Sequence, residues 1–284
     1  MATVGVVGLG TMGGPMAACM VKAGLRVVGF DVREQARAAL ASAGGEPVGS
    51  LAELAELAEQ VHVVVVDDAQ LQSVVLGQEG LLGLLRPGSV IVIHSTVPPA
   101  TCVALAEAAQ AAGIDVLDAP VGGAPMAAAA GTLTLMIGGE AAVVERCRDA
   151  FDAIAAQVFH LGGTGTGEVA KIANNLMGFI ALQGTFEGLA LAADYGIDAQ
   201  MMLQVAALSS GDSWAVRSWN ALRAANAEAV ASGAAGLVSL SHKDMSLALT
   251  LGRQAGTELP VAGVVAEWLE RPFLPGSSAP TDTG

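Results

Sequence analysis

Apolar residues follow two patterns along the chain, and the pattern changes near residue 165. In the first part, apolar runs of strand length alternate with stretches of helical spacing; the runs are 3–7, 26–30, 61–66, 89–93, 114–119, 132–137 and 157–161. In the second part strand-like runs nearly vanish, and helical spacing predicts helices over 168–195, 199–208, 213–231, 239–255 and 260–270. Strands that alternate with helices indicate a parallel, doubly wound sheet, so the first part is predicted to be α/β.

The change of pattern predicts two domains, which suits a chain of 284 residues. We expect an α/β domain over 1–163 and an all-helical domain over 164–271, built around one long helix. A further helix is predicted between 140 and 155. The segment 272–284 is rich in Pro, Gly, Ser and Thr, and we expect it to be a disordered tail.

The first predicted strand leads directly into a glycine-rich turn and then a helix. The turn has the motif G-x-G-x-x-G and comprises Gly8, Leu9, Gly10, Thr11, Met12 and Gly13. Its glycines permit a tight turn, close approach of a pyrophosphate, and close packing of the helix on the strand. The N–H groups of the helix N-terminus then face the phosphates. This pattern predicts a doubly wound Rossmann domain that binds a dinucleotide through these six residues.

The second predicted strand ends at Asp31, at about the spacing from Gly8 where an acid hydrogen-bonds the adenosine ribose. A carboxylate there repels a 2′-phosphate, which favours NAD over NADP. Arg33 can partly accommodate that phosphate, so NADP stays open as a second cofactor. We assign Asp31, Val32 and Arg33 to the cofactor site. The alternative is that Asp31 is the N-cap of the next helix.

A second glycine-rich turn, Gly162–Gly167, opens the predicted long helix. Lys171 and Asn175 are four residues apart in that helix and share one face, with Asn174 at its flank. An amine there can exchange a proton with a substrate oxygen while the amides hold the rest of the molecule. The alternative is a lysine that extends to solvent from the start of a packed helix.

Two loops at predicted strand ends are candidates for ligand contact. Ser95 and Thr96 precede a helix that starts with Pro; they are placed either to meet a ligand above the sheet or to cap that helix. The loop Pro120–Pro125 is rich in backbone donors. His94 has no second His or acid at a useful spacing, and we give it no role.

Composition excludes several classes of partner. The net charge of −14 argues against nucleic acid and anionic membranes. The chain is 53% apolar and 14% charged, which indicates large buried surfaces and a subunit interface. Three scattered cysteines without metal-ligand spacing favour a reducing compartment and no metal site. The charge-free runs 1–21 and 119–139 are broken by Gly and Pro, so neither predicts a membrane span. We expect a soluble, cytoplasmic protein.

Four motifs occur in order along the chain: GLGTMGGPM at 8–16, DAPVGG at 118–123, GGTGTGEVAKIANN at 162–175 and HKD at 242–244. Together they resemble the β-hydroxyacid dehydrogenase family, which includes 3-hydroxyisobutyrate dehydrogenase and tartronate semialdehyde reductase. The resemblance extends to about residue 270. It implies an NAD- or NADP-dependent oxidoreductase that transfers a hydride between the nicotinamide and the hydroxyl carbon of a short 3-hydroxy acid. It also implies a homodimer or homotetramer assembled through the helical domain.

The resemblance implies roles for individual residues. Lys171 is the catalytic acid and base, and Asn175, with Asn174, holds the substrate. Gly122 and Gly123 offer donors to the substrate carboxylate. Beside the glycine turn and the segment after the second strand, the residues implied to contact the cofactor are Val65, Val66, Thr96 and Lys243.

The chain departs from the family in two places that bear on specificity. Family members usually have Ser followed by two Gly where this chain has Gly122-Gly123-Ala124. The missing hydroxyl removes a hydrogen bond to the substrate and makes room, so the acid itself stays open. NADP-dependent members often have Asn-Arg-Thr or Asn-Arg-Ser where this chain has Asp31-Val32-Arg33, which supports NAD.

Two other functions are compatible with the same fold. An imine reductase usually has Asp or Tyr in place of the catalytic Lys, so Lys171 argues against it. A dinucleotide-binding protein without catalytic activity would need neither Lys171 nor Asn175. A dehydrogenase needs both.

Overall fold

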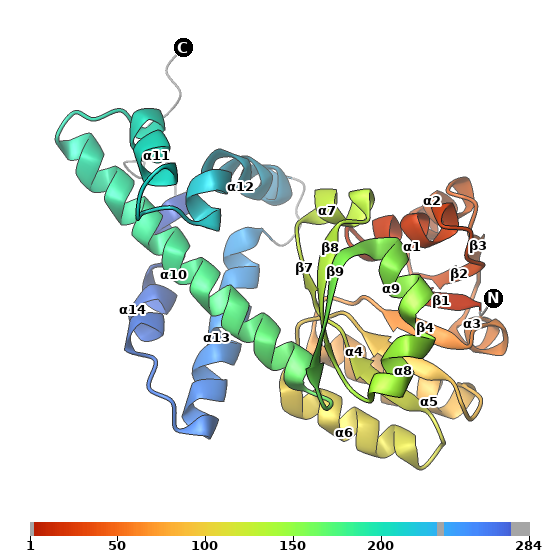
Figure 1. The fold of residues 1–284 in the computed structure, drawn as a ribbon. Coiled ribbons are helices and arrows are strands. Elements are labelled where there is room, and N and C mark those ends of the chain that lie inside the picture. Colours follow the sequence, from red (N-terminus) through yellow and green to blue (C-terminus); the bar gives the residue numbers. More distant parts are fainter. Residues whose placement is uncertain (1–2, 232–235, 274–284) are drawn as a thin grey trace. The chain divides into compact units, whose positions relative to one another are not determined.

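A computed structural model describes residues 3–231 and 236–273 (Figure 1). Contacts divide the chain into two compact units, Met1–Lys171 and Ile172–Gly284. The first unit holds a sheet with helices on both faces, and the second is helical. The predicted α/β class and the helical second part built around one long helix are therefore confirmed.

The sheet of the first unit has the strand order β3-β2-β1-β4-β5-β6-β8-β7, with β9 paired to β8. Its strands are β1 Val4–Val7, β2 Val27–Phe30, β3 Glu46–Pro47, β4 Gln60–Val63, β5 Val90–Ile93, β6 Asp115–Asp118, β7 Val121–Gly122, β8 Leu133–Gly138 and β9 Ala155–Gly162. From β3 to β6 every pairing is parallel, as expected for a doubly wound sheet.

The expectation of a wholly parallel sheet is wrong beyond β6. There β8 pairs antiparallel with both β6 and β7. A parallel return needs a long crossover, usually a helix that packs across the sheet. Between β6 and β8 the chain instead forms β7 and the six-residue helix α7, Pro125–Ala130. Strand β8 therefore runs back from the edge at which β6 ended.

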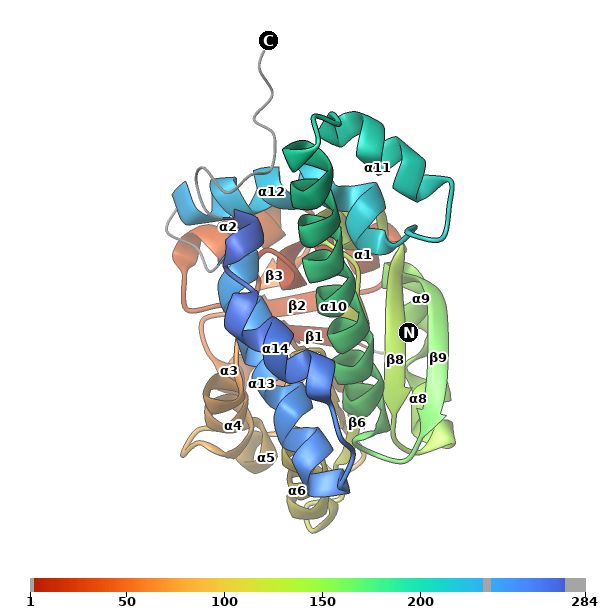
Figure 2. The same ribbon diagram turned by 90° about the vertical axis from the view of Figure 1, so that its left-hand side faces the viewer.

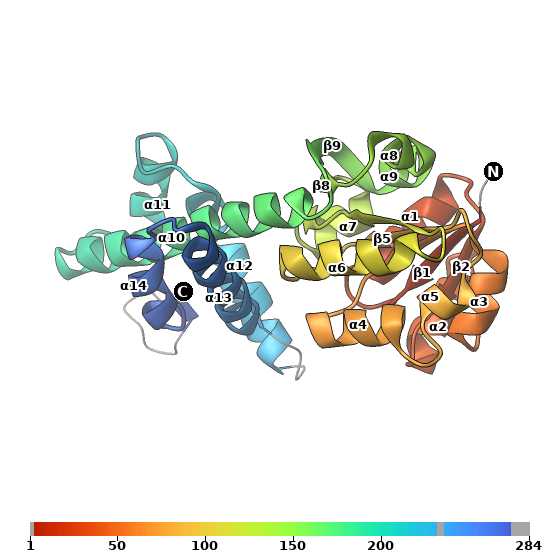
Figure 3. The same ribbon diagram turned by 90° about the horizontal axis from the view of Figure 1, so that it is seen from below.

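Helices cover both faces of the sheet (Figure 3). Side chains of α1, α2, α7, α8 and α9 contribute to one buried apolar cluster, and those of α3, α4, α5 and α6 contribute to another. The bounds of these helices, beside α7, are α1 Gly13–Lys22, α2 Glu34–Ser42, α3 Leu51–Leu57, α4 Asp68–Leu76, α5 Leu81–Leu84, α6 Pro99–Gln110, α8 Ala141–Arg146 and α9 Arg148–Ile154. The single helix predicted over 140–155 is two helices, because the chain leaves helical geometry at Cys147 (φ −99°, ψ 4°).

The second unit packs its helices around one apolar core (Figure 2). Its elements are α10 Thr166–Asp194, which begins in the first unit, α11 Ala199–Ala207, α12 Trp214–Ala231, α13 Leu237–Ala255, α14 Pro260–Trp268 and the 3₁₀ helix η1 Arg271–Phe273. Within the expected tail, Pro272 is buried and its carbonyl oxygen accepts a hydrogen bond of 2.8 Å from Arg223. Residues 274–284 lie outside the described residues.

Among the described residues, α10 alone is long and apolar enough for a membrane span, by length and composition only. This criterion is weak evidence, because core helices of soluble proteins also meet it. One face of α10 contributes Phe179, Leu182 and Phe186 to the core of the helical unit. Other apolar side chains of the helix, including Met177 and Leu191, are exposed.

Candidate functional site

The turn between β1 and α1 can only be built from glycine at two of its positions. Gly8 has φ +90°, and a Cβ added there would lie 2.2 Å from the carbonyl oxygen of Val64. A Cβ added at Gly13 would lie 1.9 Å from the carbonyl oxygen of Gly8. Helix α1 begins at Gly13 without a side-chain cap from Met12. The turn thus suits a pyrophosphate bound by backbone N–H groups at a helix N-terminus.

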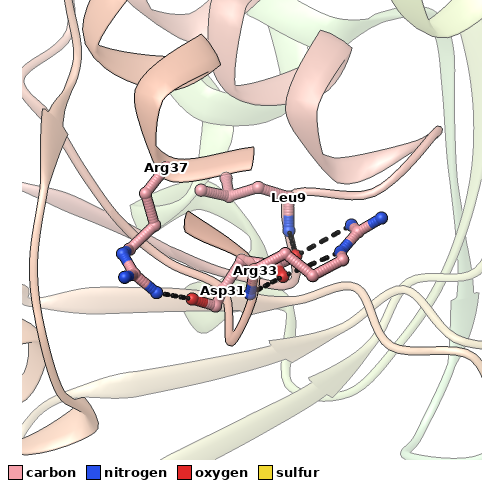
Figure 4. Close-up of polar contacts among 4 residues, drawn as sticks. All are labelled: Leu9, Asp31, Arg33 and Arg37. Atoms are coloured by element: carbon pink, nitrogen blue, oxygen red, sulfur yellow. Dashed lines mark hydrogen bonds and ion pairs between the residues drawn. The ribbon is translucent and has the colours of Figure 1, made fainter. Parts of the chain in front are cut away.

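Asp31 lies at the end of β2 and contacts this turn directly (Figure 4). Its Oδ2 accepts a hydrogen bond of 2.8 Å from the N–H of Leu9. Its Oδ1 accepts from the backbone N–H of Arg33 at 2.9 Å and from Nε of Arg33 at 3.1 Å, and Nη2 of Arg33 is 3.1 Å from Oδ2. Arg37 donates to the carbonyl oxygen of Asp31. The alternative role for Asp31 is not observed, because α2 begins at Glu34 with Arg33 as its N-cap residue.

The contacts of Asp31 stabilise its ionised form. Burial raises the pKa of this carboxyl, but the hydrogen bonds from Arg33 and Leu9 and the charge of Arg33 outweigh burial, so the pKa is lowered. The side chain of Arg33 remains 63% exposed. Between them, Val32 is also exposed. The acid expected to bind a ribose and the cation expected to accommodate a phosphate therefore form an ion pair with each other.

The loops after β4 and β5 are joined by Ser95. Its Oγ donates to the carbonyl oxygen of Val65 at 2.7 Å and accepts from the N–H of Val65 at 3.0 Å. Because both backbone groups of Val65 bond to a side chain, the strand predicted to extend to Val66 ends at Val63. Ser95 does not cap α6, which follows Pro98. Thr96 is half-buried in the same loop.

Positions 122 and 123 differ in whether the structure has room for a side chain there. Gly122 lies in β7, and a Cβ added there would lie 3.3 Å from Cε of Met136, the end of a flexible side chain. Gly123 has φ +126°, and a Cβ there would lie 2.9 Å from a methyl group of Leu133. A side chain therefore fits at position 122 with a small shift, whereas position 123 requires glycine.

Helix α10 carries Lys171, Asn174 and Asn175 on consecutive turns, with Lys171 and Asn175 half-buried and Asn174 exposed. Nδ2 of Asn175 donates to Oδ2 of Asp244 at 2.7 Å, and Nδ2 of Asn174 donates to Oδ1 of Asn175 at 3.3 Å. Nζ of Lys243 lies 3.1 Å from Oδ1 of Asp244. Asp244 is buried on α13. It thus contacts both Asn175, which is predicted to hold the substrate, and Lys243, which is predicted to contact the cofactor.

Sequence reasoning gave Asp244 no role, although it is the last residue of the HKD motif. The predicted site residues divide between the two units. Those in the first are Gly8, Leu9, Gly10, Thr11, Met12, Gly13, Asp31, Val32, Arg33, Val65, Val66, Thr96, Gly122, Gly123 and Lys171. Those in the second are Asn174, Asn175 and Lys243.

His94, just before Ser95, is buried against a second histidine. Nδ1 of His62 in β4 lies 2.8 Å from Nε2 of His94, whose Nδ1 lies 2.7 Å from the carbonyl oxygen of Ala119. His94 was given no role because no His or acid lies at a useful spacing in sequence; the pairing of β4 with β5 brings His62, 32 residues away, against its ring. Burial lowers the pKa of His94 to about 4, although the bond to Ala119 opposes it. Burial and the charge of His94 hold the pKa of His62 well below its usual value.

This pair makes the protein less stable in acid. Between about pH 6.5 and about pH 4 the unfolded histidines bind protons that the folded ones do not, so the free energy of unfolding falls as the pH falls. At about pH 5 the expected loss from His94 alone is on the order of 2 kcal/mol. Denaturant unfolding at about pH 7.5 and about pH 5 measures it. His94→Gln should weaken this dependence of unfolding free energy on pH; a dependence equal to that of the wild type would contradict the explanation.

Two protein families match this chain, one over most of each unit. Residues 3–162 match the family described as the NAD binding domain of 6-phosphogluconate dehydrogenase. Residues 165–276 match the family described as NAD-binding of NADP-dependent 3-hydroxyisobutyrate dehydrogenase. The cofactor class expected from the glycine turn is therefore confirmed: the chain binds NAD, with NADP as a further candidate.

Relatives match the chain over nearly its whole length. A 3-hydroxyisobutyrate dehydrogenase of Pseudomonas aeruginosa is 37% identical over 267 residues, 93% of this chain and 90% of the relative. An NAD-dependent L-serine dehydrogenase of the same organism is 33% identical with the same coverage. The crystal structure of a 3-hydroxyisobutyrate dehydrogenase from Salmonella typhimurium superposes with a TM-score of 0.82 at 30% identity, covering 95% of this chain and 93% of that one. Solved imine reductases share the fold at lower identity.

The fold, the glycine turn and these matches define an NAD(P)-dependent oxidoreductase. Its sequence similarity to dehydrogenases covers both units. The chain belongs to the β-hydroxyacid dehydrogenase family.

Proposed function

We propose that this enzyme oxidises the hydroxyl group of a short 3-hydroxy acid with NAD, and reduces the corresponding semialdehyde in the reverse direction. The observation that carries the proposal is Lys171 four residues before Asn175 on α10, directly after the Gly162–Gly167 turn. Bound NAD supplies the hydride acceptor. Lys171 takes the proton of the substrate hydroxyl as the hydride leaves its carbon, and returns it in the reverse reaction.

The remaining candidate residues bind and orient. The amides of Asn174 and Asn175 hold the substrate, and the bond from Asn175 to Asp244 fixes the orientation of that amide. Backbone N–H groups at Gly122 and Gly123 bind the substrate carboxylate. The glycine turn, Asp31–Arg33, Val65–Val66, Thr96 and Lys243 bind the cofactor. The proposed division is a cofactor domain over 1–163 and a substrate domain over 164–271.

A screen of substrates tests the proposal against its two alternatives. The purified enzyme is incubated with NAD or NADP and 3-hydroxyisobutyrate, L-serine or a larger 3-hydroxy acid, and the absorbance of the reduced cofactor is followed. Oxidation of at least one acid supports the proposal. Reduction of cyclic imines without oxidation of any acid would indicate an imine reductase. Cofactor binding without either reaction would indicate a non-catalytic protein.

We propose that the protein is cytoplasmic and forms a homodimer or homotetramer through its helical domain. Large apolar side chains on this unit are exposed in the single chain: Met177, Leu191, Tyr195, Met201, Leu208, Val261 and Val264. Covering such side chains is the usual source of stability in obligate oligomers. Light scattering after size-exclusion chromatography should give two or four times 28.3 kDa. A mass of one chain at micromolar concentration would contradict the assembly.

Gly122→Ser is expected to shift substrate preference toward smaller acids. The new Cβ displaces only the end of Met136, and the hydroxyl can donate to the substrate carboxylate. A charge-assisted bond of this kind contributes about 1.5–3 kcal/mol, or roughly 10- to 100-fold in kcat/KM. The measurement is the ratio of kcat/KM for 3-hydroxyisobutyrate to that for a bulkier 3-hydroxy acid. Gly83→Ser, where an added Cβ meets open space, is the control. A water that already fills the position would leave the ratio unchanged and contradict the argument.

A further inference from the structure

A buried carboxylate at the end of β6 is bonded to the turn that begins α10. Oδ1 of Asp118 accepts a hydrogen bond of 2.6 Å from the N–H of Gly165, and Oδ2 accepts one of 3.0 Å from the N–H of Glu168. Asp118 is fully buried. Burial raises the pKa of this carboxyl, and the hydrogen bonds from the N–H groups of Gly165 and Glu168 oppose that shift. Because both oxygens accept from N–H groups, the ionised carboxylate matches the donors around it.

The glycines around Asp118 make room for its carboxylate. A Cβ added at Gly138 would lie 2.6 Å from Oδ1 of Asp118, and one added at Gly167 would lie 2.8 Å from Oδ2. Gly165, which donates to Oδ1, has φ +95°. The glycine content of the Gly162–Gly167 turn therefore has a local cause: the backbone must approach a carboxylate closely while it turns into a helix.

Glu168 extends this contact to the loop after β5. It is fully buried, and its Oε2 accepts a hydrogen bond of 3.2 Å from the N–H of Val97. Strands β5 and β6 are parallel neighbours, with Ile93 paired to Asp118, so both contacts lie at the carboxyl end of the sheet. The first turn of α10 is thereby held by one strand end and by the loop that contains Thr96.

We propose that Asp118, together with Glu168, is a positioning residue for Lys171. Lys171 lies one helical turn after Glu168, so the bonds that fix the first turn of α10 also fix where its amine is held relative to the cofactor loop. The inference rests on the proposed catalytic role of Lys171. Asp118 itself exchanges no proton with the substrate. Misplacement of a catalytic group by about 1 Å is enough to lower turnover by roughly 100-fold.

A double-mutant cycle tests this role with 3-hydroxyisobutyrate and NAD. Asp118→Asn keeps the shape, but its amide NH₂ replaces one acceptor and opposes a backbone N–H. The variant should lower kcat by about 10- to 100-fold in the wild-type background, with little change in the Kd for NAD. In the Lys171→Ala background, Asp118→Asn should lower kcat by less than about twofold, because the amine that it would misplace is absent. Amide hydrogen exchange at Gly165 and Glu168 should become faster.

Each outcome of the cycle decides a different point. Equal losses of kcat in the two backgrounds would overturn the positioning role, because a general loss of folded enzyme acts independently of Lys171. If Lys171→Ala alone kept wild-type turnover, the proposed function would fail instead. Ser50→Ala removes the cap of α3, where Oγ of Ser50 accepts from Glu53 at 3.1 Å, and should leave kcat unchanged. Should Asp118→Asn not fold, the cycle is run with Glu168→Gln, with an expected loss of about 3- to 10-fold in the wild-type background only.

Discussion

Lys171→Ala is expected to lower kcat by about 10²–10⁴ and to leave the Kd for NAD nearly unchanged. The expected loss follows from removal of the group proposed to take the substrate proton. Lys171→Arg should lose a similar amount, because a guanidinium keeps the positive charge but does not release its proton. Steady-state kinetics and cofactor titration by fluorescence measure the two quantities.

The chain offers a matched control for this experiment. Lys22 is exposed in the last turn of α1, and Lys22→Ala should keep wild-type kinetics. Turnover by Lys171→Ala within twofold of wild type, with NAD still bound, would remove Lys171 from the mechanism.

Cofactor preference should move in opposite directions when the two partners of the Asp31–Arg33 ion pair are replaced. The wild-type enzyme is expected to have a higher kcat/KM with NAD than with NADP, because a carboxylate repels a 2′-phosphate. Asp31→Asn should lower the ratio of kcat/KM with NAD to that with NADP by roughly 10- to 100-fold, because charge-assisted hydrogen bonds to the ribose contribute about that much. Arg33→Ala should widen the difference in kcat/KM between NAD and NADP, since Arg33 bonds both carboxylate oxygens of Asp31 and is the cation expected to accommodate a 2′-phosphate.

The measurement is the ratio of kcat/KM for the two cofactors in each variant. Arg26, at the other end of β2, forms an exposed ion pair of 3.0 Å with Glu46, and Arg26→Ala should leave the ratio unchanged. A wild-type enzyme that prefers NADP would mean that Arg33 outweighs Asp31. A ratio that moves in the same direction in both variants would show that the pair does not set the preference.

Features that depend on neighbouring residues could be predicted from the sequence. The turn at Gly8–Gly13, the longer strands of the first unit and the long helix from Thr166 follow from spacing over a few residues. The two-residue strands β3 and β7 were not predicted, and β7 lies in the segment expected to be a loop. The direction of β8 could not be predicted in this way. It depends on whether 119–132 crosses the sheet, and apolar periodicity does not record the path of a connection.

Side-chain partners far apart in sequence were also beyond prediction. His62 and His94 are 32 residues apart, Asp118 and Gly165 are 47 apart, and Asn175 and Asp244 are 69 apart. Strand order and helix packing bring these groups together, and no local pattern marks one as the partner of another. The Rossmann motif relates the glycine turn to the acid at the end of the second strand, but the bond from the N–H of Leu9 to Asp31 was not predicted either.

The course of α10 limits how this enzyme can be recombined with its relatives. Lys171 is the last residue of one compact unit, and Asn175 lies in the next, yet both belong to one unbroken helix. Four residues of α-helix set a rise of about 6 Å between them, which backbone hydrogen bonds maintain. A chimera joined at the unit boundary would therefore take Lys171, the proposed proton-transfer residue, from one parent and Asn175, the proposed substrate amide, from the other. Joining instead before Asp118 would transfer the helix together with the carboxylate that holds its first turn.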